Sequence, residues 1–468
     1  MSKLLKKPTE KTPENIQAKF EKFNLKENPF PSEPVVNKDS QDKRINGDIY
    51  EQQIRTKEYD QILNTFIKQS QSDPNHHRLG YIIDTSYIGR GNGKSAFLVN
   101  LQNKINKEYC LDLTNEMNKC FSIYVTPEPG GRTKTFSKFI DSIFIAIIKS
   151  GVIKVSIGIL RLEALYEIYP ETAKVFNEIS DEEIIENLND LSWFENHNIK
   201  LSKISEYIIN HEFLDKLPSE FPLIQEKLNL SSPFITQDDF IDYYTRVLKR
   251  KSEKHEFIFT DLVRLFLGAG FNGAYVLVDD FERIPDFQSA RQKKDFALEL
   301  RSVLFDGLYL NSKIGFYNIL LVLHAGVPRL ISDAWAESGM ENRAPISPPT
   351  SSKHVIHFGK LNKEHAKLLI QKYLEEYRLD NKGNSSLYPF TEGAISVIGQ
   401  LSEYNAAKIL KMAYDLLDKA VQLKDIDKID EEFVEKNKVL EDSSSEKYSS
   451  DFSDIDSENL VQKALGKN

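Results

Sequence analysis

The chain has few of the residues that mark secreted, disulfide-bonded or membrane-spanning proteins. Only two of its 468 residues are cysteine, Cys110 and Cys120, and no metal-ligand spacing surrounds them. A reducing, cytoplasmic location is therefore expected. The N-terminus has no apolar stretch long enough for a signal peptide. The most apolar window, residues 139–160, is interrupted by charged residues and glycine, so we predict no membrane span and no membrane partner.

Negative charge is concentrated near one end of the chain. The net charge is -9, and residues 425–458 alone hold 13 acidic and 4 basic side chains. Because that segment accounts for the whole excess, the rest of the chain is neutral overall and a nucleic-acid surface on it is not excluded. From about residue 441 the serine- and acid-rich sequence predicts a disordered tail.

A glycine-rich turn between two patterned segments is the most informative stretch. The apolar run Tyr81–Ile83 predicts a buried strand, and apolar residues at helical spacing follow from Ala96 to Ile105. Backbone N–H groups of the glycine turn can converge on an anion, and Lys94 and Ser95 come next. In a phosphate-binding loop of this kind, the lysine ammonium reaches the β- and γ-phosphates of a nucleotide, and the serine hydroxyl binds Mg²⁺. The agreement of turn, Lys-Ser pair and flanking elements favours this site over a chance glycine loop at a helix cap. The predicted nucleotide-binding residues are Gly89, Gly91, Asn92, Gly93, Lys94, Ser95 and Ala96, of which Ser95 is also a predicted metal ligand.

Two adjacent carboxylates follow another apolar run, Ala274–Val278. In a chain with a phosphate loop, carboxylates at the carboxyl end of a buried strand are the expected second half of the site. We predict that Asp279 binds Mg²⁺ through its water shell. Asp280 is predicted to polarise the attacking water, with Glu282 as the substitute.

A histidine ends the next predicted strand, 318–323. A polar residue at this point of such a parallel sheet lies beside the γ-phosphate, so His324 is a candidate sensor. A buried structural histidine is the equally weighted alternative.

Apolar runs and helical periodicities alternate along the chain. This pattern predicts an α/β fold with a parallel sheet flanked by helices. Residues 155–255 are a predicted helical insertion, and Thr260 is the predicted N-cap of the next helix. The first 24 residues are polar and are expected to be mobile. The predicted strands lie at 81–83, 120–126, 274–278, 318–323 and 354–358, and the predicted domains are an N-terminal extension at 1–49, a core at 50–360, a helical lid at 361–440 and the tail at 441–468.

Several segments taken together carry a family resemblance. They are GRGNGKS at 89–95, VLVDDFER at 276–283, LVLHAGVPR at 321–329, PFTEGAI and LSEYNAAKIL between 389 and 410, and NPF at 28–30. The set resembles the AAA+/STAND class of P-loop ATPases, particularly the branch with origin-recognition ATPases, TnsC-like transposition regulators and BREX-type ATP-binding proteins. The resemblance implies a P-loop sheet with a helical lid, ATP and Mg²⁺ as ligands, and ATP hydrolysis.

The sequence departs from that class in three places. Ile88 stands where the phosphate loop usually begins with glycine, and Asp280 replaces the usual glutamate. The lid turn offers Lys408 where an arginine is expected, which makes Lys408 the candidate nucleotide contact from the lid.

The resemblance also implies assembly. In this class the γ-phosphate lies near a subunit boundary, where a neighbour's arginine can stabilise charge in the transition state. Arg329 and Arg343 follow the strand that ends at His324, and Arg343 is preferred because its polar loop looks more exposed. Ordinary surface salt bridges are the evenly weighted alternative.

Two functions remain open from the sequence. The first is an ATPase that assembles with itself or a protein partner on DNA, in replication, transposition or anti-phage defence, although no DNA-reading motif is present. The second is a slow nucleotide-dependent switch that recruits a protein effector without DNA contact, and the three departures modestly favour it. A GTPase is a poorer fit, because no NKxD-like motif follows the carboxylate strand. The basic cluster at 246–254 is interpreted as a solvated helix face in preference to a DNA contact.

Overall fold

The computed structural model describes residues 19–67, 77–86, 90–109, 119–209, 234–324, 326–347, 353–380 and 386–437. Gly89, Ile88 and the predicted tail at 441–468 lie outside these ranges. The chain divides into two units. We call them the helical unit, made of Met1–Thr56, Ser86–Phe97 and Gly359–Asn468, and the sheet unit, made of Lys57–Thr85 and Leu98–Phe358. This division differs from the predicted domains, because the N-terminal extension and the glycine turn group with the helical lid.

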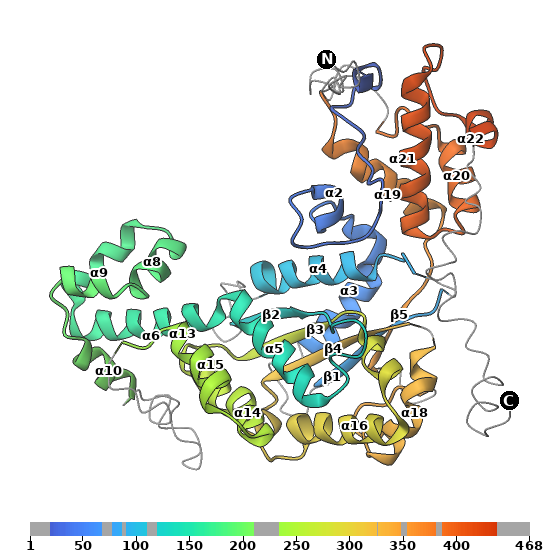
Figure 1. Ribbon diagram of the computed structural model, residues 1–468. Helices are drawn as coiled ribbons and strands as arrows, with labels where there is room; N and C mark the ends of the chain where they lie inside the picture. The colour runs from blue at the N-terminus through green and yellow to red at the C-terminus, as the bar shows by residue number, and fades with distance from the viewer. Residues whose placement is uncertain are drawn as a thin grey trace, which may run out of the picture. The chain divides into compact units, whose positions relative to one another are not determined.

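All five predicted strands are present and form one parallel sheet in the order β2-β3-β4-β1-β5 (Figure 1). The register aligns Val278 with Leu321 across β3 and β4, and Ile83 with Leu323 across β1 and β4. The carboxyl ends of these three neighbours therefore share one edge, where the residues that follow β3 and β4 meet. The strands are β1 (Leu79–Asp84), β2 (Cys120–Val125), β3 (Gly273–Val278), β4 (Tyr317–Leu323) and β5 (Val355–Phe358).

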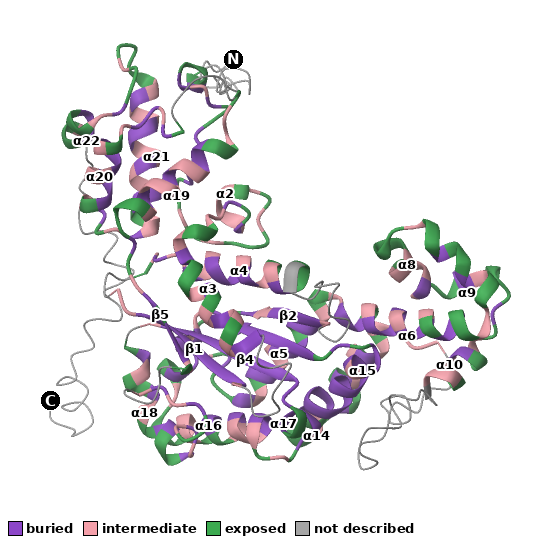
Figure 2. Ribbon diagram, turned by 180° about the vertical axis from the view of Figure 1, so that it is seen from behind, coloured by how far each residue is buried: buried purple, intermediate pink, exposed green. Residues whose placement is uncertain are grey.

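Helices cover both faces of the sheet, which explains why the strands are nearly continuous apolar runs. Figure 2 shows the strands buried along most of their length. On one face, alternate strand residues pack with α5 (Phe136–Ser150) and α16 (Ala290–Phe305) in a large hydrophobic core. On the other face, Phe66, in the π-helical turn after α3 (Thr56–Ile62), packs so closely over Gly80 that a Cβ there would lie 2.2 Å from the ring. The remaining helices of this part are α4 (Lys94–Lys104), α17 (Leu310–Ile314) and α18 (Val327–Glu337).

The predicted insertion is helical, as expected, and a buried arginine ties its parts together. Arg161 on α6 (Val152–Ile168) donates from Nη1 to the carbonyl of Leu188 at 2.7 Å and from Nη2 to that of Ile235 at 2.6 Å. Burial lowers the pKa of Arg161 to about 9. No single described helix is long and apolar enough to cross a membrane, and α5 and α6 meet that test only as a pair bent by 54°. The other insertion helices are α7 (Pro170–Ala173), α8 (Asp181–Leu188), α9 (Leu191–Asn196), α10 (Leu201–Ile209), α13 (Gln237–Asp242) and α14 (Lys251–Glu256), and α15 (Leu262–Gly268) follows them.

The prediction that Thr260 is an N-cap is wrong. Thr260 lies in a π-helical turn, Phe257–Asp261, that joins α14 to α15 without a break. Its buried hydroxyl accepts a hydrogen bond from the backbone N–H of Leu310 at 3.3 Å. The hydroxyl therefore serves a tertiary contact, which residue type alone does not distinguish from a cap.

The basic cluster at 246–254 is largely neutralised by carboxylates. Four of its five cations face an acid, which supports the interpretation as a solvated surface over a DNA contact. The pairs are Arg246–Asp242 at 3.0 Å, Arg250–Glu253 at 3.9 Å, Lys254–Asp141 at 3.1 Å and a short contact between Lys251 and Glu299.

His255 is expected to make the stability of the sheet unit depend on pH. The side chain lies on α14, is 6% exposed, and meets Phe136 edge to face with ring centroids 5.3 Å apart. Burial, reinforced by the charge of Lys251, lowers the pKa of His255 from 6.5 to about 4. Because the unfolded chain binds this proton more readily, the free energy of unfolding should fall as pH drops from 6.5 to 4, by at most about 1.4 kcal/mol per pH unit.

Urea unfolding of the wild type and of His255→Gln across this pH window measures that contribution. The carboxylates that titrate nearby are common to both proteins, so the wild type should lose more stability on acidification than the variant. His357→Gln, at an exposed position on β5, is the control and should follow the wild type. Parallel profiles for wild type and His255→Gln would contradict the prediction.

The helical unit contains the predicted lid helices and two shorter helices that were not predicted. The lid helices are α19 (Lys363–Glu376), α20 (Glu392–Leu401) and α21 (Ala406–Gln422), and the additional helices are α2 (Lys43–Asn46) and α22 (Glu431–Asn437). Phe20 and Phe23 are 6% and 0% exposed in the same core. The expected mobility is therefore wrong for residues 19–24, since two aromatic side chains are enough to fasten a mostly polar segment.

The NPF segment has a packing role. The Asn28 side-chain amide donates to the carbonyl of Tyr414 at 3.1 Å, and its oxygen accepts the backbone N–H of Phe30 at 3.2 Å. The Phe30 ring is fully buried and stacks on Tyr373 with centroids 6.1 Å apart. The segment therefore serves as an anchor for the N-terminal extension on α19 and α21.

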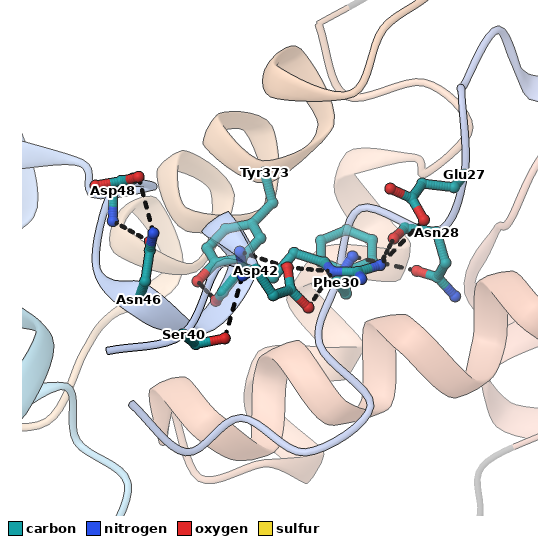
Figure 3. Close-up of polar contacts among 9 residues, drawn as sticks. Glu27, Asn28, Phe30, Ser40, Asp42, Asn46, Asp48 and Tyr373 are labelled. Atoms are coloured by element: carbon teal, nitrogen blue, oxygen red, sulfur yellow. Dashed lines mark hydrogen bonds and ion pairs between the residues drawn. The ribbon is translucent and has the colours of Figure 1, made fainter. Parts of the chain in front are cut away.

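Polar contacts around Glu27, Asn28, Asp42 and Tyr373 fasten the remainder of the extension (Figure 3). Arg44 is the common partner of these four residues. Its guanidinium pairs with Asp42 at 2.9 Å and Glu27 at 3.5 Å, and donates to the carbonyl of Asn28 at 3.0 Å. The Tyr373 hydroxyl donates to the backbone carbonyl of Arg44 at 3.0 Å. These bonds make the extension an integral part of the helical unit.

Candidate functional site

The glycine turn has the backbone geometry that its sequence predicts. Gly91 and Gly93 have φ angles of +96° and +84°, which a residue with a side chain adopts only at a cost. Helix α4 begins at once with Lys94, and the N–H of Phe97 donates to the carbonyl of Gly93 at 3.0 Å. The first turn of a helix offers N–H groups and the positive end of its dipole to an anion. Residues 90–97 can therefore hold a phosphate group.

The predicted ligands on α4 occupy its first turn. Lys94 is 8% exposed, whereas Ser95 and Ala96 are partly exposed. The short stem of serine keeps the hydroxyl close to this helix start, as a Mg²⁺ ligand beside bound phosphates requires.

The first turn of α21 holds the glycine turn. The side-chain amide of Asn405 donates to the carbonyl of Arg90 at 2.8 Å, and the backbone N–H of Ala407 donates to the carbonyl of Gly91 at 2.9 Å. A Cβ on Gly91 would lie 2.7 Å from the Cβ of Ala407. Close approach, in addition to the positive φ angle, therefore requires glycine at position 91.

A second support comes from Arg55, next to α3. Its Nη2 donates to the carbonyls of Gly359 at 2.9 Å and Asn92 at 3.4 Å, and the Asn92 side-chain amide donates to the same Gly359 carbonyl at 3.0 Å. Arg55 and Asn92 are 4% and 1% exposed. The Asn92 side chain is bonded to the Gly359 carbonyl. The group of Asn92 that we predict to bind the nucleotide is therefore its backbone N–H.

Lys408 is the predicted lid contact to the nucleotide, and the structure gives it a different neighbour. Its ammonium lies 3.8 Å from the carboxylate of Glu403, with half of the lysine side chain exposed. The residues of this lid turn that contact the glycine turn are Asn405 and Ala407.

Asp279 follows β3 and is held by two hydrogen bonds. Its Oδ2 accepts the hydroxyl of Tyr124 at 2.6 Å, and its Oδ1 accepts the backbone N–H of Asp280 at 3.0 Å. The side chain is buried. Because a carboxylate has about four acceptor positions, the two bonds orient Asp279 and leave capacity for the water ligands of a metal ion.

Asp280 adopts a left-handed backbone conformation, with φ +48°. Its carboxylate makes a short ion pair with Arg283, whose guanidinium also donates to the carbonyl of Pro127 at 3.2 Å. The Asp280 side chain remains 27% exposed. Water can therefore reach the predicted base, while Arg283 restrains it.

The structure brings His324 to Glu282. His324 Nε2 lies 2.9 Å from Glu282 Oε1, and the two side chains are 26% and 7% exposed. One ligand atom from each of Asp280, Glu282 and His324 lies within 4.8 Å of the others. Two carboxylates and an imidazole can bind a divalent cation, and this mixed donor set suits Mn²⁺ or Zn²⁺ better than Mg²⁺, which prefers oxygen.

The two candidate arginines lie at different ends of the sheet. Arg329 is exposed on the first turn of α18, directly after β4. Arg78 directly precedes β1. Burial, followed by the charge of Arg343 nearby, lowers the pKa of Arg78. Arg343 therefore lies toward the amino end of β1, away from the edge that carries His324. Of the two candidates, Arg329 is therefore the one that lies beside the end of β4.

Four supporting residues have no predicted role: Arg55, Tyr124, Arg283 and Asn405. Each contacts a predicted site residue or its immediate neighbour through a hydrogen bond or ion pair. Arg283 alone is close in sequence to its partner, three positions after Asp280, so a charge-pair rule could have found it. The other three are distant in sequence and carry no local signal.

No protein-family model matches this chain, and neither does any curated protein or solved structure.

Proposed function

We propose that the chain binds ATP with Mg²⁺ and hydrolyses it as a P-loop ATPase of the AAA+/STAND kind. The observation that carries the proposal is the glycine turn. Gly91 and Gly93, both with positive φ, lead directly into a helix that begins Lys94-Ser95, after the first strand of a parallel sheet. This is the arrangement that presents backbone N–H groups, a helix dipole and an ammonium to a polyphosphate. Titration with a fluorescent ATP analogue and Mg²⁺ tests it, with micromolar binding expected and absence of saturable binding as the contrary result.

Each predicted site residue is assigned a role in hydrolysis that suits its side-chain chemistry. Ser95 and Asp279 would hold Mg²⁺, which neutralises negative charge on the phosphates when bound. Asp280 would orient the attacking water as the general base. The His324 ring, which Glu282 holds at the end of β4, fits the predicted sensor of the γ-phosphate.

Hydrolysis is expected to depend on assembly through Arg329. An arginine from a neighbouring subunit would stabilise charge that develops in the transition state. Specific activity should then rise with protein concentration. Arg329→Ala should lower turnover by about 10³-fold or more at saturating ATP.

Arg343→Ala is the matched control, because it removes an exposed arginine at the other end of the sheet. Mixing Arg329→Ala with Lys94→Ala subunits should restore activity, since each supplies what the other lacks. Activity that is flat with concentration and unrestored by mixing would place the complete site within one chain.

A slow nucleotide switch without DNA contact is the second candidate. It is favoured by Lys408, which pairs with Glu403, and by the neutralised basic cluster at 246–254. ATP turnover with and without duplex DNA separates the two. Stimulation by DNA supports the DNA-transaction ATPase, including a role in defence, whereas slow turnover indifferent to DNA supports the switch.

A further inference from the structure

Asn405 makes two hydrogen bonds with opposite ends of one buried amide. Its Oδ1 accepts the backbone N–H of Lys408 at 3.2 Å, which caps α21, and its Nδ2 donates to the carbonyl of Arg90 at 2.8 Å. The residue is fully buried. The cap alone would be satisfied by serine, threonine or aspartate. The second bond uses the N–H₂ group that only an amide supplies.

The bonds to the glycine turn fix the direction of its N–H groups. Arg90 and Gly91 each give their carbonyl to α21, through Asn405 and Ala407. In a planar trans peptide the N–H of the next residue points away from the carbonyl. The N–H groups of Gly91 and Asn92 are therefore turned away from α21, on the side where an anion could bind.

We propose that Asn405 is a positioning residue that couples docking of α21 to phosphate binding. The inference rests on the proposed nucleotide binding and extends it: the lid senses the shape of the phosphate loop instead of contacting the nucleotide with an arginine. Nucleotide and α21 both favour the same loop conformation, so each strengthens the binding of the other. The engagement of Lys408 with Glu403 is consistent with a lid that makes no charged contact to phosphate.

Asn405→Asp tests the proposal, because aspartate keeps an acceptor for the Lys408 N–H and replaces the donor that reaches Arg90. ATP affinity should weaken about 5- to 150-fold, the range of ordinary coupling between sites. Asn405→Ser, which also keeps the cap, guards against a variant that misfolds through repulsion between carboxylate and carbonyl. Asn362→Asp is the matched control, since Asn362 caps α19 through the N–H of His365 in the same unit. Its ATP affinity should be unchanged.

Trypsin provides a readout that needs no nucleotide. Arg90 is exposed, and the carbonyl of the peptide bond that trypsin would cleave is the one that Asn405 holds. Without nucleotide, cleavage after Arg90 should be at least about 10-fold faster in Asn405→Asp and Asn405→Ser than in the wild type and in Asn362→Asp. ATP should slow cleavage of the wild type, as reciprocal coupling requires.

The affinity and cleavage measurements together distinguish failure of the Asn405 proposal from failure of the proposed nucleotide binding. Unchanged cleavage in both folded Asn405 variants overturns the positioning role, and faster cleavage with unchanged ATP affinity overturns the coupling. A wild type that binds no nucleotide would overturn the proposed function and the coupling with it. Faster cleavage of the variants would in that case still establish that Asn405 holds the loop.

Discussion

Lys94→Ala is expected to abolish tight ATP·Mg²⁺ binding in a protein that remains folded. The ammonium is the one side-chain charge predicted to reach the β- and γ-phosphates, and a charge-assisted hydrogen bond to a buried anion contributes about 1.5–3 kcal/mol. Loss of one such bond weakens affinity by about 10- to 150-fold, and loss of two weakens it by about 150-fold or more. Equilibrium titration with a labelled nucleotide measures the change directly.

Two further variants control for lost packing and for the general loss of a positive charge. Lys94 is 8% exposed, so Lys94→Met, which fills the same space without charge, separates electrostatics from packing. Lys107→Ala removes an exposed lysine on the turn that follows α4 and should bind ATP like the wild type. Unchanged affinity in folded Lys94→Ala and Lys94→Met would remove the basis for a phosphate loop.

Asp280→Asn is expected to leave ATP bound and to stop its hydrolysis. A positioned general base contributes about 10²–10⁴-fold to a rate, and its loss lowers kcat with little effect on ground-state affinity. The structure adds the Arg283 ion pair to this prediction, since an amide at position 280 would keep a hydrogen-bond acceptor for the guanidinium but lose the negative charge. Single-turnover hydrolysis and nucleotide affinity should both be measured.

The exposed pair Arg291–Asp295 on α16 offers a matched control for this substitution. Asp295→Asn removes the same charge from an exposed ion pair that is not part of the predicted site, and this variant should hydrolyse ATP normally. If Asp280→Asn hydrolyses ATP at the wild-type rate, Glu282→Gln is the next variant. A 100-fold loss there would move the role of the base to Glu282.

The sheet could be predicted from sequence because its strands are buried on both faces. Each of the five strands is a short run of mostly apolar residues, so composition alone located them. The glycine turn was equally accessible, since two positive φ angles and a helix start leave a local signature in residue type. Local conformation and burial are the two properties that a short stretch of sequence encodes well.

Tertiary support could not be predicted in the same way. Asn405 and Arg55 reach the glycine turn from distant parts of the chain, and each resembles an ordinary cap or surface residue when considered alone. The packing of Phe20 and Phe23 was missed because two aromatics in a lysine-rich segment do not form a helical stripe. The position of Arg343 was missed because the chain after β4 returns to the opposite end of the sheet.

The helical unit is built from segments that lie far apart in the sequence, so it cannot be completed until late in synthesis. The glycine turn leaves the ribosome early, yet Asn405 and Ala407, which hold its carbonyls, are made more than three hundred residues later. At about 5–20 residues per second the delay is roughly 15–60 s. During that interval the turn lacks the contacts that orient its N–H groups. Under the proposed function, a nascent or prematurely terminated chain should therefore bind nucleotide more weakly than the complete chain.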